Sequence, residues 1–180
     1  APGASVSPPA SAALPHDTRA AIAGGFGHPG VVELFSFNPD AAGFGKGGII
    51  IETAALYDGA GKPVSWSGGG EQLSLRIHCR AVQDVFSPIV GFMVKDRLGQ
   101  VVFAENTHRV YATRPLELTA GDRFSAQFDF VMPVMPTGNY TVAVAVAEGT
   151  ESEHVQHHWI HDAIVIKVHS SQVCHGLVGI

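Results

Sequence analysis

Apolar and polar residues alternate along two segments, residues 71–82 and 123–131, in the pattern of a β-strand with one buried face. Other segments rich in β-branched and aromatic residues predict further strands at 31–37, 47–57, 86–95, 101–103 and 140–147, with a short edge segment at 116–118. Turn-forming residues separate these segments, and no stretch has a convincing helical period. We therefore predict an all-β chain folded as an immunoglobulin-like antiparallel β-sandwich.

A histidine-rich segment at residues 154–162 leads directly into a β-branched run at 163–169. This run, and the all-β pattern before it, favour extended structure for the whole segment. On a strand, side chains 157, 159 and 161 would point to one face, and side chains 154, 156, 158 and 160 to the other. On a helix, four histidines would instead share one face, at positions 154, 157, 158 and 161.

The expectation for a metal site depends on which of these conformations the histidines adopt. Overlapping i, i+4 histidine pairs on a helix have the spacing to bind zinc. On a strand, His157 and His161 would lie roughly 13 Å apart at about 3.3 Å per residue, too far to share one ion. Because extended structure is favoured, we expect neither a metal nor another cofactor.

Residues 1–30 differ in composition from the rest of the chain. The first eleven are rich in Ala, Pro and Ser, which is typical of a linker. A single helical turn is expected at 17–22, ended by Gly24 and Gly25. We therefore predict a linker or tail at 1–30 and a β-sandwich module at 31–180, attached to a part of the protein upstream.

Composition narrows the classes of partner. The chain has 180 residues, 46% of them hydrophobic, and a formal net charge of −5. These values fit one globular domain and argue against nucleic acid or an anionic membrane as the main partner. No apolar run approaches the roughly 20 residues of a spanning helix, and the start has no signal-peptide pattern. Cys79 and Cys174 allow one disulfide, but two reduced thiols in a cytoplasmic protein are favoured.

Motifs of common enzyme classes are missing from the sequence. Two Gly-x-Gly-Lys segments, at 43–46 and 59–62, lack the upstream glycine and the following Ser or Thr of a phosphate-binding loop. The sequence has neither a Gly-x-Ser-x-Gly elbow nor a His-Glu-x-x-His pair. We interpret the two glycine-lysine segments as hairpin turns and expect no catalytic activity from this chain.

Three parts of the chain resemble the C-terminal domain of Wzt, the ATP-hydrolysing subunit of the ABC transporter that exports O-antigen polysaccharide. They are residues 90–100 with 106–107, residues 135–140 with 144–150, and residues 154–171 with 176–179. The resemblance covers about residues 31–180. It implies a dimerising β-sandwich module, itself not an enzyme, that binds the modified non-reducing end of the O-antigen polysaccharide.

The resemblance also implies further partners and a location. A nucleotide-binding domain would lie upstream of the module. A transmembrane transporter subunit would hold the protein at the cytoplasmic side of the inner membrane. A purely structural domain that only dimerises or docks is the alternative function.

Two faces of the predicted sandwich are candidates for the glycan site. If strands 71–82 and 123–131 are neighbours, their outward side chains form one polar field, consisting of Arg76, His78, Arg80, Ser125, Gln127 and Asp129. The other face has a floor of small residues, Thr141, Ala143, Ala145 and Ala147, with His157, Trp159 and His161 at its rim. We favour the polar field, because Arg and His donors suit hydroxyls and an anionic cap. Trp159 is expected to be an aromatic platform for a sugar or a core residue.

The two faces have simpler interpretations as well. The polar field fits an ordinary solvated face, and the alanine floor fits a face covered at a dimer contact. Residues 173–180 form an apolar tail after a polar break at 170–172. Burying one Val or Leu side chain stabilises by roughly 1.5–3 kcal/mol, so the tail is expected to pack against protein. We predict that residues 172–180 pair with an edge strand of the other protomer, which gives a strand-exchanged dimer.

Overall fold

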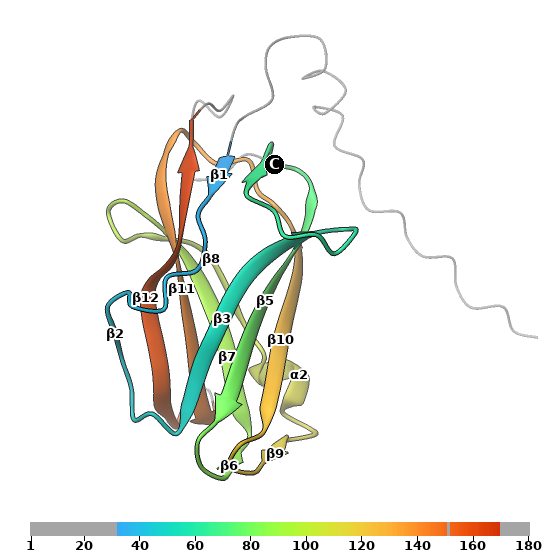
Figure 1. Ribbon diagram of the computed structural model, residues 1–180, viewed down its shortest axis with the longest axis vertical. Helices are drawn as coiled ribbons and strands as arrows, with labels where there is room; N and C mark the ends of the chain where they lie inside the picture. The colour runs from blue at the N-terminus through green and yellow to red at the C-terminus, as the bar shows by residue number, and fades with distance from the viewer. Residues whose placement is uncertain (1–31, 151, 170–180) are drawn as a thin grey trace, which may run out of the picture.

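The computed structural model describes residues 32–150 and 152–169, and these residues form two antiparallel sheets packed against each other (Figure 1). The larger sheet runs in the order β4 (Trp66–Ser67), β1 (Val32–Leu34), β12 (His154–Val168), β11 (Gly138–Gly149), β7 (Pro88–Asp96) and β8 (Val101–Asn106), and β2 (Gly43–Phe44) also pairs with β12. The smaller sheet runs in the order β10 (Arg123–Val131), β5 (Gln72–Ala81) and β3 (Ile49–Asp58). The prediction of an all-β antiparallel sandwich is confirmed.

Three short elements lie at one end of the sandwich. Strand β6 (Val85–Phe86) pairs with β9 (Glu117–Leu118), and the four-residue helix α2 (His108–Tyr111) lies near them. Figure 1 shows this end opposite to the end that carries β1.

The hydrophobic core lies between the two sheets, on the faces that the alternating pattern predicts. In β5 the inward side chains are buried, namely Leu73, Leu75, Ile77 and Cys79. In β11 the buried inward set is Val142, Val144 and Val146. Phe92 of β7 joins the two layers, because its ring centroid lies 5.0 Å from that of Phe128 in β10. The outward residues of these strands are therefore free to form surfaces of their own.

Three local features differ from the predicted elements. The strand expected at 31–37 ends early, at Leu34, and Phe35 is already 39% exposed. The strand expected at 86–95 is divided, because Ser87 adopts a φ of 57° and Pro88, which has no N–H to donate, begins β7. Helix α2 was not predicted, since one helical turn is too short to show an apolar period.

The histidine-rich segment is extended along its whole length. Strand β12 continues from His154 to Val168 and pairs with β11 for most of that length. The expected extended conformation is confirmed, and the helical alternative that would have brought four histidines onto one face is wrong.

Several sequence predictions concern residues outside the described ranges. These are the linker at 1–30, the helical turn at 17–22, the tail at 172–180 and Cys174. Cys79 is fully buried, and burial, helped by the negative charge of Glu52, raises the pKa of its thiol to about 12. Across residues 32–150 and 152–169, no helix is long and apolar enough to cross a membrane.

Candidate functional site

A β-bulge in β12 decides which side chains reach the outer face of the larger sheet. Val146 of β11 pairs with His158, and Ala147 pairs with Gln156, so His157 is an extra residue without a partner in β11. An inserted residue shifts the alternation of a strand by one position. Gln156 and Trp159 therefore both lie on the outer face, and the predicted grouping of 157, 159 and 161 on one side is wrong.

The two central histidines turn inward and bind the start of β3. His157 Nδ1 accepts a hydrogen bond from the backbone N–H of Gly48 at 3.1 Å, and His158 Nδ1 accepts one from Ile51 at 3.0 Å. Burial lowers the pKa of His158. Both imidazoles thus join β12 to the opposite sheet, which makes them structural residues.

His157 is also paired with a carboxylate. Because its Nδ1 is an acceptor, its Nε2 carries the hydrogen and donates to Glu148 Oε2 at 3.0 Å. The other oxygen of Glu148 accepts the backbone N–H of Phe86 at 2.8 Å. Burial alone would raise the pKa of Glu148, but these two hydrogen bonds outweigh it, and the pKa lies below its ordinary value. His157, only 3% exposed, is therefore not at the rim of any face.

No metal centre is found in the part of the chain that the structure describes. Within residues 32–150 and 152–169, no group of three or more His, Cys, Asp or Glu side chains is placed to hold an ion.

The outer face of the larger sheet is hollowed into a groove of about 280 Å³. Its floor consists of small or apolar residues of β11 and β7, namely Ala143, Ala145, Ala147, Ile89, Gly91 and Met93. Ala145 lies at the centre, paired with Gly91 on one side and Trp159 on the other. Because the central positions are alanines of β11 and Gly91 of β7, the middle of the floor is low, and longer side chains of the neighbouring strands stand at its sides.

The two walls of the groove come from opposite edges of this floor. One wall is formed by His154, Gln156 and Trp159 of β12, and the other by β8 and the start of α2. The second wall includes Ala104, Glu105, Asn106 and His108. Polar groups therefore lie at the margins of the groove, and the floor between them is apolar.

The indole of Trp159 is held in place by its neighbours. Its ring stacks on Phe44 of β2, with centroids 5.9 Å apart and planes inclined by 14°. Its Nε1–H donates to His161 Nδ1 at 3.2 Å. The amino group of Lys95 lies 5.8 Å from the ring centroid. A fixed aromatic wall costs little further ordering when a ligand binds against it.

Strand β2 and the residue that follows it approach β12 so closely that glycine is needed. Gly45 has a φ of 146°, and a Cβ at this position would collide with the carbonyl oxygen of His157. The close approach is what allows Phe44 to pair with Trp159 in the sheet and stack on its ring.

Gln156 supports the bulge from the groove side. Its Nε2 donates to the carbonyl oxygens of Val146 at 2.7 Å and His158 at 3.0 Å. Both N–H groups of the amide are therefore used on the backbone around the extra residue. The amide Oε1 of Gln156 is left as the acceptor that a ligand can reach.

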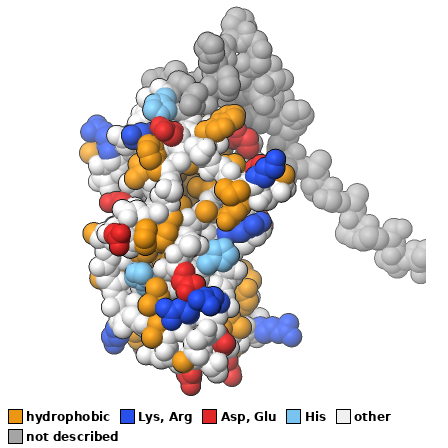
Figure 2. All heavy atoms as spheres, viewed as in Figure 1, with side chains coloured by type: hydrophobic (Ala, Val, Ile, Leu, Met, Phe, Trp, Pro, Cys, Tyr) orange, Lys and Arg blue, Asp and Glu red, His pale blue; other side chains and the backbone are white. Residues whose placement is uncertain are grey.

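The polar field predicted from the sequence forms on the outer face of the smaller sheet. In the register of β5 and β10, Arg76 pairs with Gln127 and His78 with Ser125, so the predicted neighbourhood is confirmed. Figure 2 views the molecule from this side and shows cationic, anionic and histidine side chains intermixed. The outward side chains of β5 and β10 thus form the expected polar field.

The side chains of this field largely bind one another. Arg76 Nε donates to Gln127 Oε1 at 3.0 Å, and Gln127 Nε2 donates to Asp129 Oδ1 at 2.9 Å. Asp129 also accepts the Ser74 hydroxyl, and this bond, followed by that from Gln127, lowers the pKa of Asp129. The guanidinium of Arg76 lies 4.4 Å from the centroid of the Tyr57 ring.

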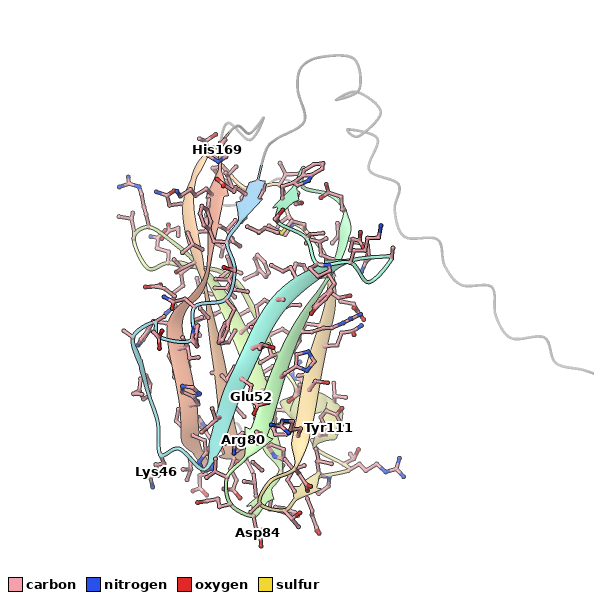
Figure 3. The ribbon with its side chains drawn as sticks, viewed as in Figure 1. Lys46, Glu52, Arg80, Asp84, Tyr111 and His169 are labelled. Carbon is pink, nitrogen blue, oxygen red and sulfur yellow. The ribbon has the colours of Figure 1, made fainter. Side chains whose placement is uncertain are left out.

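A second group on the same sheet is equally self-contained. Glu52 bridges Arg80 at 2.9 Å and Arg123 at 3.0 Å, and Figure 3 shows Glu52 and Arg80 side by side. The hydrogen bond from Arg123 is the main cause of the lowered pKa of Glu52.

The structure does not bring the six predicted site residues together. Arg76, His78, Arg80, Gln127 and Asp129 belong to the smaller sheet, and Trp159 faces outward from the larger one. The alternative alanine floor is present, with Trp159 as a wall, but His157 is buried behind it and His161 contacts Trp159 outside the lining. Gln156, Asn106 and His108 were not foreseen, because their place depends on the bulge and on α2.

Comparisons with known proteins find a matching family and a solved structure of similar fold. The family model of the Wzt C-terminal domain matches residues 40–180. No curated protein matches the chain significantly. A crystal structure of the C-terminal domain of Wzt is similar in fold, with a TM-score of 0.68, 17% sequence identity, and coverage of 81% of this chain and 87% of that one. A Bacteroides uniformis β-glucuronidase also matches, at 11% identity, over 58% of this chain and 12% of its own, but its TM-score of 0.38 is too low to bear on the fold.

Proposed function

The chain belongs to the Wzt C-terminal domain family, and we propose that it is a non-catalytic module that binds the end of an O-antigen polysaccharide for export by an ABC transporter. Membership of the family supports a carbohydrate-binding role in O-antigen transport. The groove on the outer face of the larger sheet is the observation that supports a glycan-binding site on that face.

The groove has the form that a sugar ring needs. The C–H face of a pyranose packs well against an aromatic face, and Trp159 offers an indole already fixed by Phe44 and His161. The low floor around Ala145 lets a ring approach the sheet closely. Polar groups at both margins, including Gln156 and Asn106, can then bind the hydroxyls that project outward.

The polar field of the smaller sheet is the second candidate site. Its Arg76, His78 and Arg80 provide the donors that favoured it from the sequence. Against it stand the hydrogen bonds of Arg76, Gln127 and Asp129 to one another, which a glycan would have to replace. Replacing bonds that are already made yields little net affinity.

Single substitutions on each face distinguish the two sites. We expect Trp159→Ala to weaken binding of the native O-polysaccharide at least about tenfold, since aromatic anchors carry much of an interface energy. If the polar field is the site, Arg76→Ala and Gln127→Ala produce that loss instead. Titration calorimetry measures affinity, and the thermal midpoint of each variant controls for folding. Unchanged binding by all three variants would move the site to another face, and absence of binding by the unmodified chain would leave a purely structural domain as the better description.

The proposed module has further partners. In this proposal an upstream nucleotide-binding domain and a transmembrane transporter subunit keep it at the cytoplasmic side of the inner membrane. We also propose a homodimer formed by exchange of residues 172–180, which lie outside the described residues. Light scattering on the chain truncated after Ser171 tests the exchange, and a truncated chain that stays dimeric at micromolar concentration contradicts it.

A further inference from the structure

The groove differs from the polar field in the kind of polar group that it offers. Among the described residues, no Lys or Arg lines the groove, and its titratable lining residues are Glu105, His108 and His154. The amide hydrogens of Gln156 are spent on backbone carbonyls, so this residue presents an acceptor. Asn106 Oδ1 accepts the backbone N–H of His108 at 2.9 Å, which leaves the amide nitrogen of Asn106 as a donor.

Resting on the proposed function, we propose that this groove selects a glycan whose end is uncharged, and disfavours an end that carries phosphate, sulfate or carboxylate. A neutral sugar has C–H groups for the apolar floor and hydroxyl hydrogens for the acceptor of Gln156. An anionic group has no hydrogen to donate to that acceptor. The amide of Asn106 can donate to it, but no Lys or Arg of the described lining can pair with its charge, and charge-assisted hydrogen bonds are the strong ones for an anion.

Burial in the groove makes the mismatch more costly for an anion. A charged group that loses water without gaining a partner is strongly disfavoured. The Lys95 amino group is a nearby cation, but it lies over the Trp159 ring, at 5.8 Å from its centroid, and Lys95 is not a lining residue. The arginines Arg76, Arg80 and Arg123 belong to the other sheet. Charge selectivity therefore also separates the two candidate sites, because the polar field suits an anionic cap.

The test uses matched pairs of oligosaccharides that differ only at the terminal residue, a hexose against its uronic acid or its phosphate. Binding is measured by glycan array and calorimetry at about pH 8, where an ordinary imidazole is uncharged. We expect the anionic member of each bound pair to bind at least about tenfold more weakly. Raising the salt concentration should improve its relative binding, because salt screens repulsion.

Three substitutions at one position provide the controls. Ala104 is an exposed lining residue that pairs with Met93 across the edge of the sheet. Ala104→Lys should improve binding of the anionic probe by about threefold or more relative to the neutral one, and Ala104→Glu should act in the opposite direction. Ala104→Met adds similar bulk without charge and should leave the ratio unchanged.

The outcomes separate this inference from the proposed function. Tighter binding of anionic probes that weakens with salt, or that is lost in Lys95→Met, overturns the inference and leaves glycan binding intact. Absence of binding to every oligosaccharide and to the O-polysaccharide itself overturns both. Preference for neutral probes that the Ala104→Lys substitution reverses supports both.

Discussion

The outer faces of the two sheets use their polar residues in opposite ways. On the smaller sheet, long polar side chains stand side by side and bind one another, as Arg76, Gln127 and Asp129 do. On the larger sheet, small residues such as Ala145 occupy the centre, and polar ones stand at the margins. The outer face of the smaller sheet has many hydrogen-bonding groups, but these already bind one another, whereas the outer face of the larger sheet has room for a ligand. Side-chain size thus separates the two faces more clearly than charge does.

The largest expected effect comes from filling the groove. Ala145→Phe places a ring on the floor beside Gly91 and Trp159, and we expect glycan affinity to fall by about a hundredfold or more, since the ring occupies the space of the sugar. Ala55→Phe is the matched control, because Ala55 lies on the outer side of β3 opposite Arg76. Titration calorimetry on both variants is the test. If Ala55→Phe loses glycan binding and Ala145→Phe does not, the glycan site is on the smaller sheet.

A smaller effect is expected from Gln156→Met. The substitution keeps the size of the side chain but removes two hydrogen bonds to the carbonyls of Val146 and His158. We expect a loss of about 1–3 kcal/mol in the free energy of unfolding, measured by urea denaturation, together with weaker glycan binding. Gln127→Met on the exposed polar field should cost clearly less, and equal losses in the two variants would contradict a special role for Gln156.

A third prediction concerns acid. The pKa of Glu148 in the folded protein lies below its ordinary value of 4.5, so its ionised form stabilises the fold above about pH 4.5, and this stability is lost as the pH falls through the lowered folded pKa. Glu148→Gln should therefore flatten the decline of the thermal midpoint between about pH 5 and 3. A decline as steep as in the unmodified protein would show that the contacts of Glu148 with His157 and Phe86 contribute little.

The smallest effect is expected on the smaller sheet. Glu52→Gln weakens the bridge between Arg80 and Arg123, but exposed ion pairs contribute little because water and salt screen them. The thermal midpoint at moderate salt should stay nearly unchanged, and so should glycan binding. A large loss of binding would move the site to the polar field.

Much of the sandwich was predictable, because two strands with strict alternation can pair in few ways. The inward sets of β5 and β10, and the polar field that their outward side chains share, follow from that alternation once the two strands are neighbours. The groove was only half predictable. Its alanine floor is visible in the sequence, but the places of Gln156 and His157 depend on how many residues of β12 oppose β11. The register of two strands is a property of the pair, so neither strand alone reveals it.

The extra residue at His157 has a consequence for how such a domain can change. The two halves of β12 keep the same alternation but are out of step with each other by one residue. Exchanging side chains at 156 or 159 therefore alters the lining of the groove without touching the buried residues Ile160 and Ile164. Deleting His157 would let β12 pair with β11 without the bulge and would keep Gln156 and Trp159 on the outer face, but it would remove the hydrogen bonds of His157 to Gly48 and Glu148. Ligand preference in this fold can thus diversify by substitution at the outer positions of β12, whereas loss of the extra residue releases a contact between the two sheets.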